Sequence, residues 1–180
     1  IDMDKHIPVL LNEVIENLAI KPDGTYVDLT IGRGGHSREI AKRLTNGKLI
    51  CFDKDEQALI DCSEFLNEYK EKVTAIKSDF RNFKLELECR GIAEIDGVMA
   101  DLGVSSPQFD DASRGFSYKE NARLDMRMDQ SQSLTAYDVV NTYSLNDLTR
   151  VFREYGEDKF SYQIARKIVQ VRENKPIETT

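Results

Sequence analysis

The sequence has few of the residues that build disulfide-stapled or metal-bound proteins. Its 180 residues contain no tryptophan, two histidines and three cysteines, and Cys51, Cys62 and Cys89 share no C-x-x-C spacing. The odd number and the spacing argue against a disulfide framework and a zinc site, and a reducing cytoplasm fits them best. Neither histidine has partners in a metal-ligand pattern. We therefore predict a cytoplasmic protein without a metal.

Long apolar runs are also missing. No stretch approaches the ~20 apolar residues that a membrane span needs, and the first residues lack the basic and apolar pattern of a signal peptide. With 40% hydrophobic and 32% charged residues, the chain has enough apolar side chains for a core. Its length suits one domain with an appendage, and no membrane partner is expected.

A strong positive charge is absent as well. The net charge is −7, which argues against nucleic-acid binding by bulk electrostatics. Residues 105–180 are nearly neutral, with 11 Lys and Arg against 12 Asp and Glu. Arg114, Arg123 and Arg127 lie close together there and are candidates for phosphate contacts, although a solvated surface explains any single arginine equally well.

One stretch combines a strand, a glycine-rich turn and a helix. The mostly apolar residues 25–31 contain Asp28, and Gly32-Arg33-Gly34-Gly35-His36 follows them. Such a turn lets the backbone approach a ligand closely, beside the free N–H groups of a helix. A dinucleotide fingerprint needs a glycine where Ser37 stands, which disfavours a nicotinamide dehydrogenase. The turn favours a ligand without pyrophosphate, such as S-adenosylmethionine, and a tight turn without any ligand is the alternative.

Four strand–helix units follow one another, which predicts a parallel, doubly wound α/β sheet. A further helix is expected before them, over residues 6–18. The expected strands are residues 25–31, 49–53, 73–80 and 95–103, and the expected helices between them are residues 37–45, 56–70 and 85–90. Ligands bind such sheets at the carboxyl ends of the strands, where Gly34, Asp53, Phe80 and Asp101 fall.

Each of these strand-end residues has a specific interpretation and an ordinary one. Asp53 suits ribose hydroxyls, because a carboxylate accepts from two neighbouring OH groups, and the alternative is a helix cap, for which Asp55 is better placed. Phe80, beside the acceptor Asp79, offers a face for an adenine ring, and the alternative is a core phenylalanine.

The loop after the fourth strand carries the candidate catalytic residues. Methyl transfer is an in-line displacement in which positioning does most of the work. Asp101, Ser105 and Ser106 provide acceptors for the N–H groups of an exocyclic amine, and Gln108 suits the cofactor or the base. Without this context, Ser-Ser-Pro is an ordinary turn. Neither histidine belongs to a catalytic triad, and His36 is expected to orient the glycine-rich turn.

The second part of the chain is predicted to be helical, over residues 135–143, 145–155 and 159–173. Phe160, Ile164, Ile168 and Val171 form an apolar stripe that we expect to pack against other helices. Residues 105–180 contain no convincing strand, so the core sheet is incomplete. We expect a truncated chain, or further strands in a part outside this sequence.

Six motifs occur in one order along the chain. They are His6-Ile-Pro-Val-Leu-Leu11, Gly32-Arg-Gly-Gly-His-Ser37, Asp101-Leu-Gly-Val-Ser-Ser-Pro-Gln108, Arg114-Gly-Phe-Ser117, Leu124-Asp-Met-Arg-Met-Asp129 and Tyr155-Gly-Glu157. Together they resemble the MraW/RsmH family, the S-adenosylmethionine-dependent methyltransferases of bacterial small-subunit ribosomal RNA. The resemblance covers nearly the whole chain.

The resemblance implies a class I (Rossmann-like) methyltransferase core in residues 1–104 and an inserted helical, substrate-recognition domain in residues 105–180. It implies N4-methylation of a cytosine in the decoding centre of 16S rRNA, with the small ribosomal subunit as partner. A homodimer is left open. The family's S-adenosylmethionine contacts fall on Gly34, Gly35, His36, Asp53, Phe80, Asp101 and Gln108.

Two other functions fit parts of the sequence. A DNA amino-methyltransferase has a loosely similar catalytic loop, but an aromatic residue in place of Gln108 would suit it better, because flipped bases stack on such rings. A non-catalytic module that binds S-adenosylmethionine or RNA during ribosome assembly is disfavoured by the intact loop at Asp101.

Overall fold

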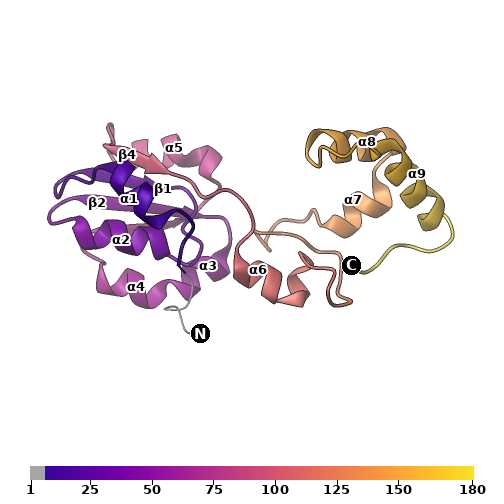
Figure 1. Ribbon diagram of the computed structural model, residues 1–180, viewed down its shortest axis with the longest axis horizontal. Coiled ribbons are helices and arrows are strands. Elements are labelled where there is room, and N and C mark those ends of the chain that lie inside the picture. Colours follow the sequence, from indigo (N-terminus) through magenta and orange to yellow (C-terminus); the bar gives the residue numbers. More distant parts are fainter. Residues whose placement is uncertain (1–6) are drawn as a thin grey trace. The chain divides into compact units, whose positions relative to one another are not determined.

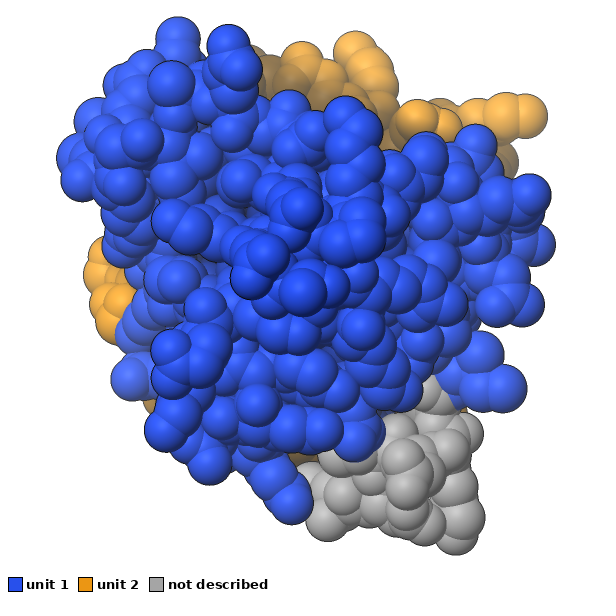
Figure 2. Space-filling view, turned by 90° about the vertical axis from the view of Figure 1, so that its left-hand side faces the viewer, with its two compact units in different colours: residues 1–105 blue, residues 106–180 orange. Residues whose placement is uncertain are grey.

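Strands and helices are unevenly divided along the chain. The computed structural model describes residues 7–180, and the chain divides into two units, residues 1–105 and 106–180 (Figure 1; blue and orange in Figure 2). The first unit holds the four-stranded sheet with its flanking helices, and the second is built from helices and long loops. Among residues 7–180, no helix has the length and apolar character needed to cross a membrane.

The sheet of the first unit is entirely parallel, as the sequence predicts. Its strands are β1 (Thr25–Asp28), β2 (Lys48–Asp53), β3 (Val73–Lys77) and β4 (Gly97–Met99), in the order β3-β2-β1-β4. Val27 of β1 lies opposite Ile50 on one side and Val98 on the other. All four carboxyl ends therefore lie at one edge of the sheet, and β1 is in the middle.

Helices pack on both faces of this sheet, which makes it doubly wound (Figure 1). The helices of the first unit are α1 (Leu11–Leu18), α2 (Gly35–Arg43), α3 (Glu56–Asp61), α4 (Ser63–Glu68), the short 3-10 helix η2 (Phe80–Asn82) and α5 (Phe83–Glu88). Tyr26 belongs to the larger core cluster, with residues of α1, α2 and α4. Val27 belongs to the smaller cluster on the other face, with residues of α5.

Several element boundaries differ from the predicted ones. The first helix begins at Leu11 and not at residue 6, because Leu10 adopts a left-handed conformation with φ of 50° that stops the helix. His6 lies outside the described residues. The helix expected over residues 56–70 is broken at Cys62, whose ψ is 0°. The fourth strand is only three residues long, so Asp101 lies on the loop beyond it.

The second unit contains α6 (Ser106–Asp110), the 3-10 helix η3 (Ala112–Arg114), α7 (Ala136–Thr142), α8 (Leu145–Glu154) and α9 (Ser161–Arg172). Thr135 and Asp138 form a capping box at the start of α7, and Ser144 caps α8. α8 and α9 pack against each other, and Leu148 and Ala165 are fully buried. The helical character predicted for this part is confirmed.

The predicted packing of the α9 stripe is wrong for most of its members. Phe160 is 65% exposed, and Ile164 and Val171 are also exposed. Ser161 and Ala165 are the buried residues of α9. Small side chains one turn apart allow two helices to approach closely, so the larger apolar residues remain outside the contact.

Gly47, in the turn between α2 and β2, is packed closely against backbone atoms. A Cβ at this position would collide with the carbonyl oxygen of Gly24 and lie 2.9 Å from that of Pro22. We expect Gly47→Ala to lower the free energy of unfolding by about 1–3 kcal/mol, because backbone atoms cannot move aside cheaply. Asn46→Ala removes only an exposed side-chain bond to Asp23 and is the control. Equal urea midpoints for the two variants would contradict this assignment.

Candidate functional site

The glycine-rich turn is fastened to the neighbouring strands at the carboxyl edge of the sheet. The N–H of Ile31 donates to the carbonyl oxygen of Phe52 at 2.9 Å, and the N–H of Gly34 closes the turn onto Ile31 at 2.7 Å. Gly32 and Gly34 have φ values of 50° and 76°, a region that residues with a side chain rarely adopt. The backbone itself therefore requires these two glycines.

Asp53, at the end of β2, fixes two loops at once. Its Oδ2 accepts the N–H of Gly32 at 3.0 Å, and its Oδ1 accepts the N–H of Asp55 at 2.9 Å. Burial raises the pKa of Asp53, and the bonds from Asp55 and Gly32 partly offset that rise. A carboxylate has about four lone-pair sites, so Asp53 keeps acceptor capacity for a ligand beside these backbone N–H groups. The N-cap of α3 is Asp55, which accepts the N–H of Gln57, as expected.

Phe80 is a partly exposed aromatic residue on a segment that is tied to the end of β2. It is 37% exposed on η2, so it is not the core phenylalanine of the alternative interpretation. The N–H of Ser78 donates to the carbonyl oxygen of Asp53 at 3.1 Å, which ties this turn to the end of β2. Asp79 is already paired with Arg81 through two bonds of 3.0 and 2.9 Å, and these bonds lower the pKa of Asp79.

Asp101 is held through its backbone and leaves its carboxylate exposed. Its N–H donates to the Oγ1 of Thr30 at 2.7 Å, which ties the loop after β4 to the glycine-rich turn. Ser105 lies in the first unit, whereas Ser106 and Gln108 belong to α6 of the second, where Gln108 is buried. The structure thus joins the turn, Asp53, the Phe80 segment and Asp101 in one unit. The parts of Ser106 and Gln108 in the site stay predictions.

The structure contains a buried polar cluster beneath the turn that the sequence-based prediction of the site did not include. Asp28, 1% exposed, accepts the N–H of Thr30 at 3.0 Å and the hydroxyl of Ser37 at 2.6 Å. The Sγ of Cys51 lies 3.2 Å from the same hydroxyl oxygen. Because Ser37 donates its proton to Asp28, the Cys51 thiol is the donor to Ser37. Burial raises the pKa of both Asp28 and Cys51.

Two features of the sequence indicate this cluster. Ser37 occupies the position where a dinucleotide fingerprint has its third glycine, and Asp28 is an acid inside an otherwise apolar strand. A buried acid needs hydrogen-bond donors, and a serine nine residues later, at the start of a helix, supplies one. Asp28 holds Thr30, and Thr30 in turn holds Asp101.

Two of the three arginines proposed for phosphate contacts have other roles. Arg114 is buried and donates to the carbonyl oxygens of Arg127 and Met128 at 3.1 and 3.2 Å. Arg127 pairs with Asp125 through bonds of 3.0 and 2.7 Å. The predicted phosphate patch is therefore wrong for Arg114 and Arg127, whose guanidinium groups hold the surrounding loop.

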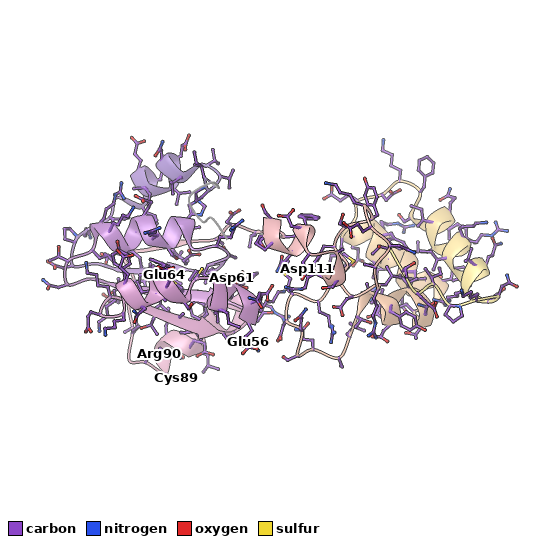
Figure 3. All side chains as sticks on the ribbon, turned by 90° about the horizontal axis from the view of Figure 1, so that it is seen from below. Glu56, Asp61, Glu64, Cys89, Arg90 and Asp111 are labelled. Carbon is purple, nitrogen blue, oxygen red and sulfur yellow. The ribbon has the colours of Figure 1, made fainter. Side chains whose placement is uncertain are left out.

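The remaining polar groups show no metal cluster and an acidic helical surface. Within residues 7–180, no three His, Cys, Asp or Glu side chains lie close enough to hold a metal ion. His36 is buried, and its ring Nε2 lies 2.9 Å from the carbonyl oxygen of Val9. Figure 3 shows Glu56, Asp61 and Glu64 on α3 and α4, and Glu56 pairs with Lys77 at 2.8 Å.

The raised pKa of Asp28 predicts a defined pH dependence of stability. Between the unfolded-state pKa, near 3.9, and the higher folded-state value, the native state binds more protons than the unfolded state. The stability from the protonated carboxyl is therefore complete below pH ~4 and is lost as the pH rises through the folded-state pKa. We expect the free energy of unfolding of the wild type to fall relative to that of Asp28→Asn over this window.

Asp96 provides a control of opposite sign. The N–H of Thr25 and the Lys21 ammonium lower the pKa of Asp96. Its contribution is thus present above the unfolded-state pKa and lost as the pH falls through the folded-state value. Urea titrations at a series of pH values should show the wild type gaining on Asp96→Asn as the pH rises toward ~4. Parallel wild-type and Asp28→Asn curves would refute the assignment of Asp28.

Comparison with known proteins places the chain in a family. The family model described as "MraW methylase family" matches residues 3–180. Two curated relatives, each named "Ribosomal RNA small subunit methyltransferase H", are 56% identical. The protein of Mycoplasmopsis synoviae (strain 53) is covered over 58% of its length by 98% of this chain, and that of Clostridioides difficile (strain 630) over 57% by 97%.

A solved structure of an rRNA methylase from Streptococcus thermophilus is 26% identical with a TM-score of 0.39, over 45% of this chain and 49% of that chain. The chain spans a little over half the length of the curated relatives it matches. The family model and the two relatives agree along nearly the whole sequence, and the chain belongs to the MraW methylase family.

Proposed function

We propose that the first unit binds S-adenosylmethionine at the carboxyl edge of its sheet. Hydrogen bonds tie both the glycine-rich turn and the segment before the partly exposed Phe80 to Asp53, and this arrangement is the main support for the proposal. The residues fit the cofactor. Asp53 suits the ribose hydroxyls as an acceptor, the ring of Phe80 suits adenine, and acids suit a ligand with a sulfonium and an amino group.

We propose further that the acceptor is the N4 atom of a cytosine in the decoding centre of 16S rRNA. The names of both relatives and the family match support an rRNA substrate. Residues 1–104 would hold the methyl donor and residues 105–180 would contact the RNA. The acids of α3 and α4 oppose phosphate contact on that surface, so RNA would approach elsewhere.

The chemistry asks little of the protein beyond positioning. S-adenosylmethionine supplies a methyl group activated by its sulfonium. An exocyclic amine is a weak nucleophile, and it loses a proton when its nitrogen gains the methyl carbon. Asp101 provides an exposed carboxylate to accept an amine N–H, on a backbone that Thr30 fixes. The hydroxyls of Ser105 and Ser106 are the further proposed acceptors.

Calorimetric titration with S-adenosylmethionine tests the donor site. We expect Asp53→Ala to weaken binding by about 1–3 kcal/mol, because ligand hydroxyls and the Gly32 N–H lose their acceptor. Asp23→Ala is the matched control, since Asp23 is an exposed acid before β1, at the opposite edge of the sheet, whose side chain bonds that of Asn46. Its affinity should stay within about twofold of the wild type. Binding that Asp53→Ala leaves unchanged would remove Asp53 from the site.

Transfer of a labelled methyl group to undermethylated small-subunit particles tests the reaction. We expect Asp101→Asn to lower the transfer rate by about 10²-fold or more, while its affinity for S-adenosylmethionine falls less. Asp61→Asn, which changes an exposed acid on α3, is the control. Equal rates for Asp101→Asn and the wild type would exclude Asp101 as the acceptor. A wild type that binds the cofactor but transfers nothing would favour the non-catalytic alternative.

A further inference from the structure

A short segment before α1, residues 7–10, lies against the first residues of α2; we call it the strap. The ring of His36 is buried, and its Nε2 lies 2.9 Å from the carbonyl oxygen of Val9. A carbonyl oxygen only accepts, so Nε2 carries the proton and donates it to the strap. The side chain of His36, which directly follows the glycines of the turn, is thus hydrogen-bonded to the N-terminal segment.

Gly35 shows a second contact with the strap. A Cβ at this position would lie far inside van der Waals contact with the Cγ of Pro8 and 3.2 Å from its Cδ. The φ of Gly35 is not positive, and Gly35 is the first residue of α2, where alanine is conformationally suitable. Gly34 differs, because its own φ of 76° requires glycine. Pro8 is therefore what keeps position 35 free of a side chain.

Hydrophobic burial contributes little to holding the strap. Ile7, Val9 and Leu10 are 81%, 58% and 62% exposed. Their apolar side chains gain little from contact with the rest of the unit. The hydrogen bond from His36 and the contact between Pro8 and Gly35 locate the segment against α2, and the N–H of Val14 donates to the carbonyl oxygen of Leu10 at its other end.

We propose that the strap is a wall of the donor site, and that the ring of His36 and the absence of a side chain at Gly35 hold it there, in addition to the cofactor contacts expected of these two residues. This inference rests on the proposed function. Both residues belong to the turn whose backbone would face the cofactor, and the N–H of Arg38 donates to the carbonyl oxygen of Gly34 in the first turn of α2. Any displacement of the strap or of the start of α2 changes the shape of that wall.

A compensating pair of substitutions separates this proposal from direct ligand contact. Gly35→Ala places a methyl group where Pro8 now lies, and we expect it to weaken S-adenosylmethionine binding by about tenfold or more. The double variant Gly35→Ala/Pro8→Ala lacks the Cγ and Cδ of Pro8. Of the three Pro8 atoms near the added methyl group only Cβ remains, at 3.5 Å from it. The double variant should regain an affinity within about threefold of Pro8→Ala. A double variant that binds as weakly as Gly35→Ala would overturn the proposal, because the space would then belong to the ligand.

Hydrogen exchange of the amides in residues 7–14 gives a readout that does not depend on the cofactor. Gly35→Ala and His36→Ala should speed this exchange. His36→Gln keeps an N–H donor and should exchange closer to the wild type, as should the double variant. Leu85→Ala, on the exposed side of α5, is the control. Unchanged exchange in Gly35→Ala and His36→Ala would overturn the strap. A wild type that binds no S-adenosylmethionine would overturn both the donor site and the role of the strap in it. Hydrogen exchange would then still show whether His36 and Gly35 hold residues 7–10 in place.

Discussion

A buried carboxylate at the end of the central strand holds the candidate site together. Asp28 accepts one hydrogen bond from Thr30 and one from Ser37, and Thr30 then supports the backbone of Asp101. Burying a carboxyl group is costly unless donors surround it, so the loops on both sides must adopt conformations that supply them. The cost of burying this group thereby favours the observed arrangement of the glycine-rich turn and of the loop after β4.

The parallel sheet and the edge at which the proposed site lies follow from features that a sequence displays openly. Apolar runs such as 49–53 alternate with helical periods, and parallel strands place Asp53 and Asp101 at one edge by necessity. Turn chemistry is equally local, as Asp55 at the start of α3 shows. These elements were predictable because neighbouring residues decide them.

The other features depend on contacts between residues far apart in the chain. Arg114 carries the same charge whether it meets a phosphate or the carbonyl oxygens of Arg127 and Met128, and only the fold decides between them. The exposed stripe of α9 has the periodicity of a packed helix, but Ser161 and Ala165 are the residues of α9 that are buried. Periodicity identifies a helix and its apolar side without specifying the partner.

Glycine shows the same ambiguity within a single motif. Gly32 and Gly34 are required by backbone angles, whereas Gly35 has ordinary angles and meets Pro8, twenty-seven residues earlier in the chain. A run of glycines in a sequence favours close approach to a ligand, because that is the common reason for such turns. Here protein atoms already occupy the space beside Gly35. The motif and the N-terminal segment are therefore one structural unit, and a substitution in either must be interpreted through its effect on the other.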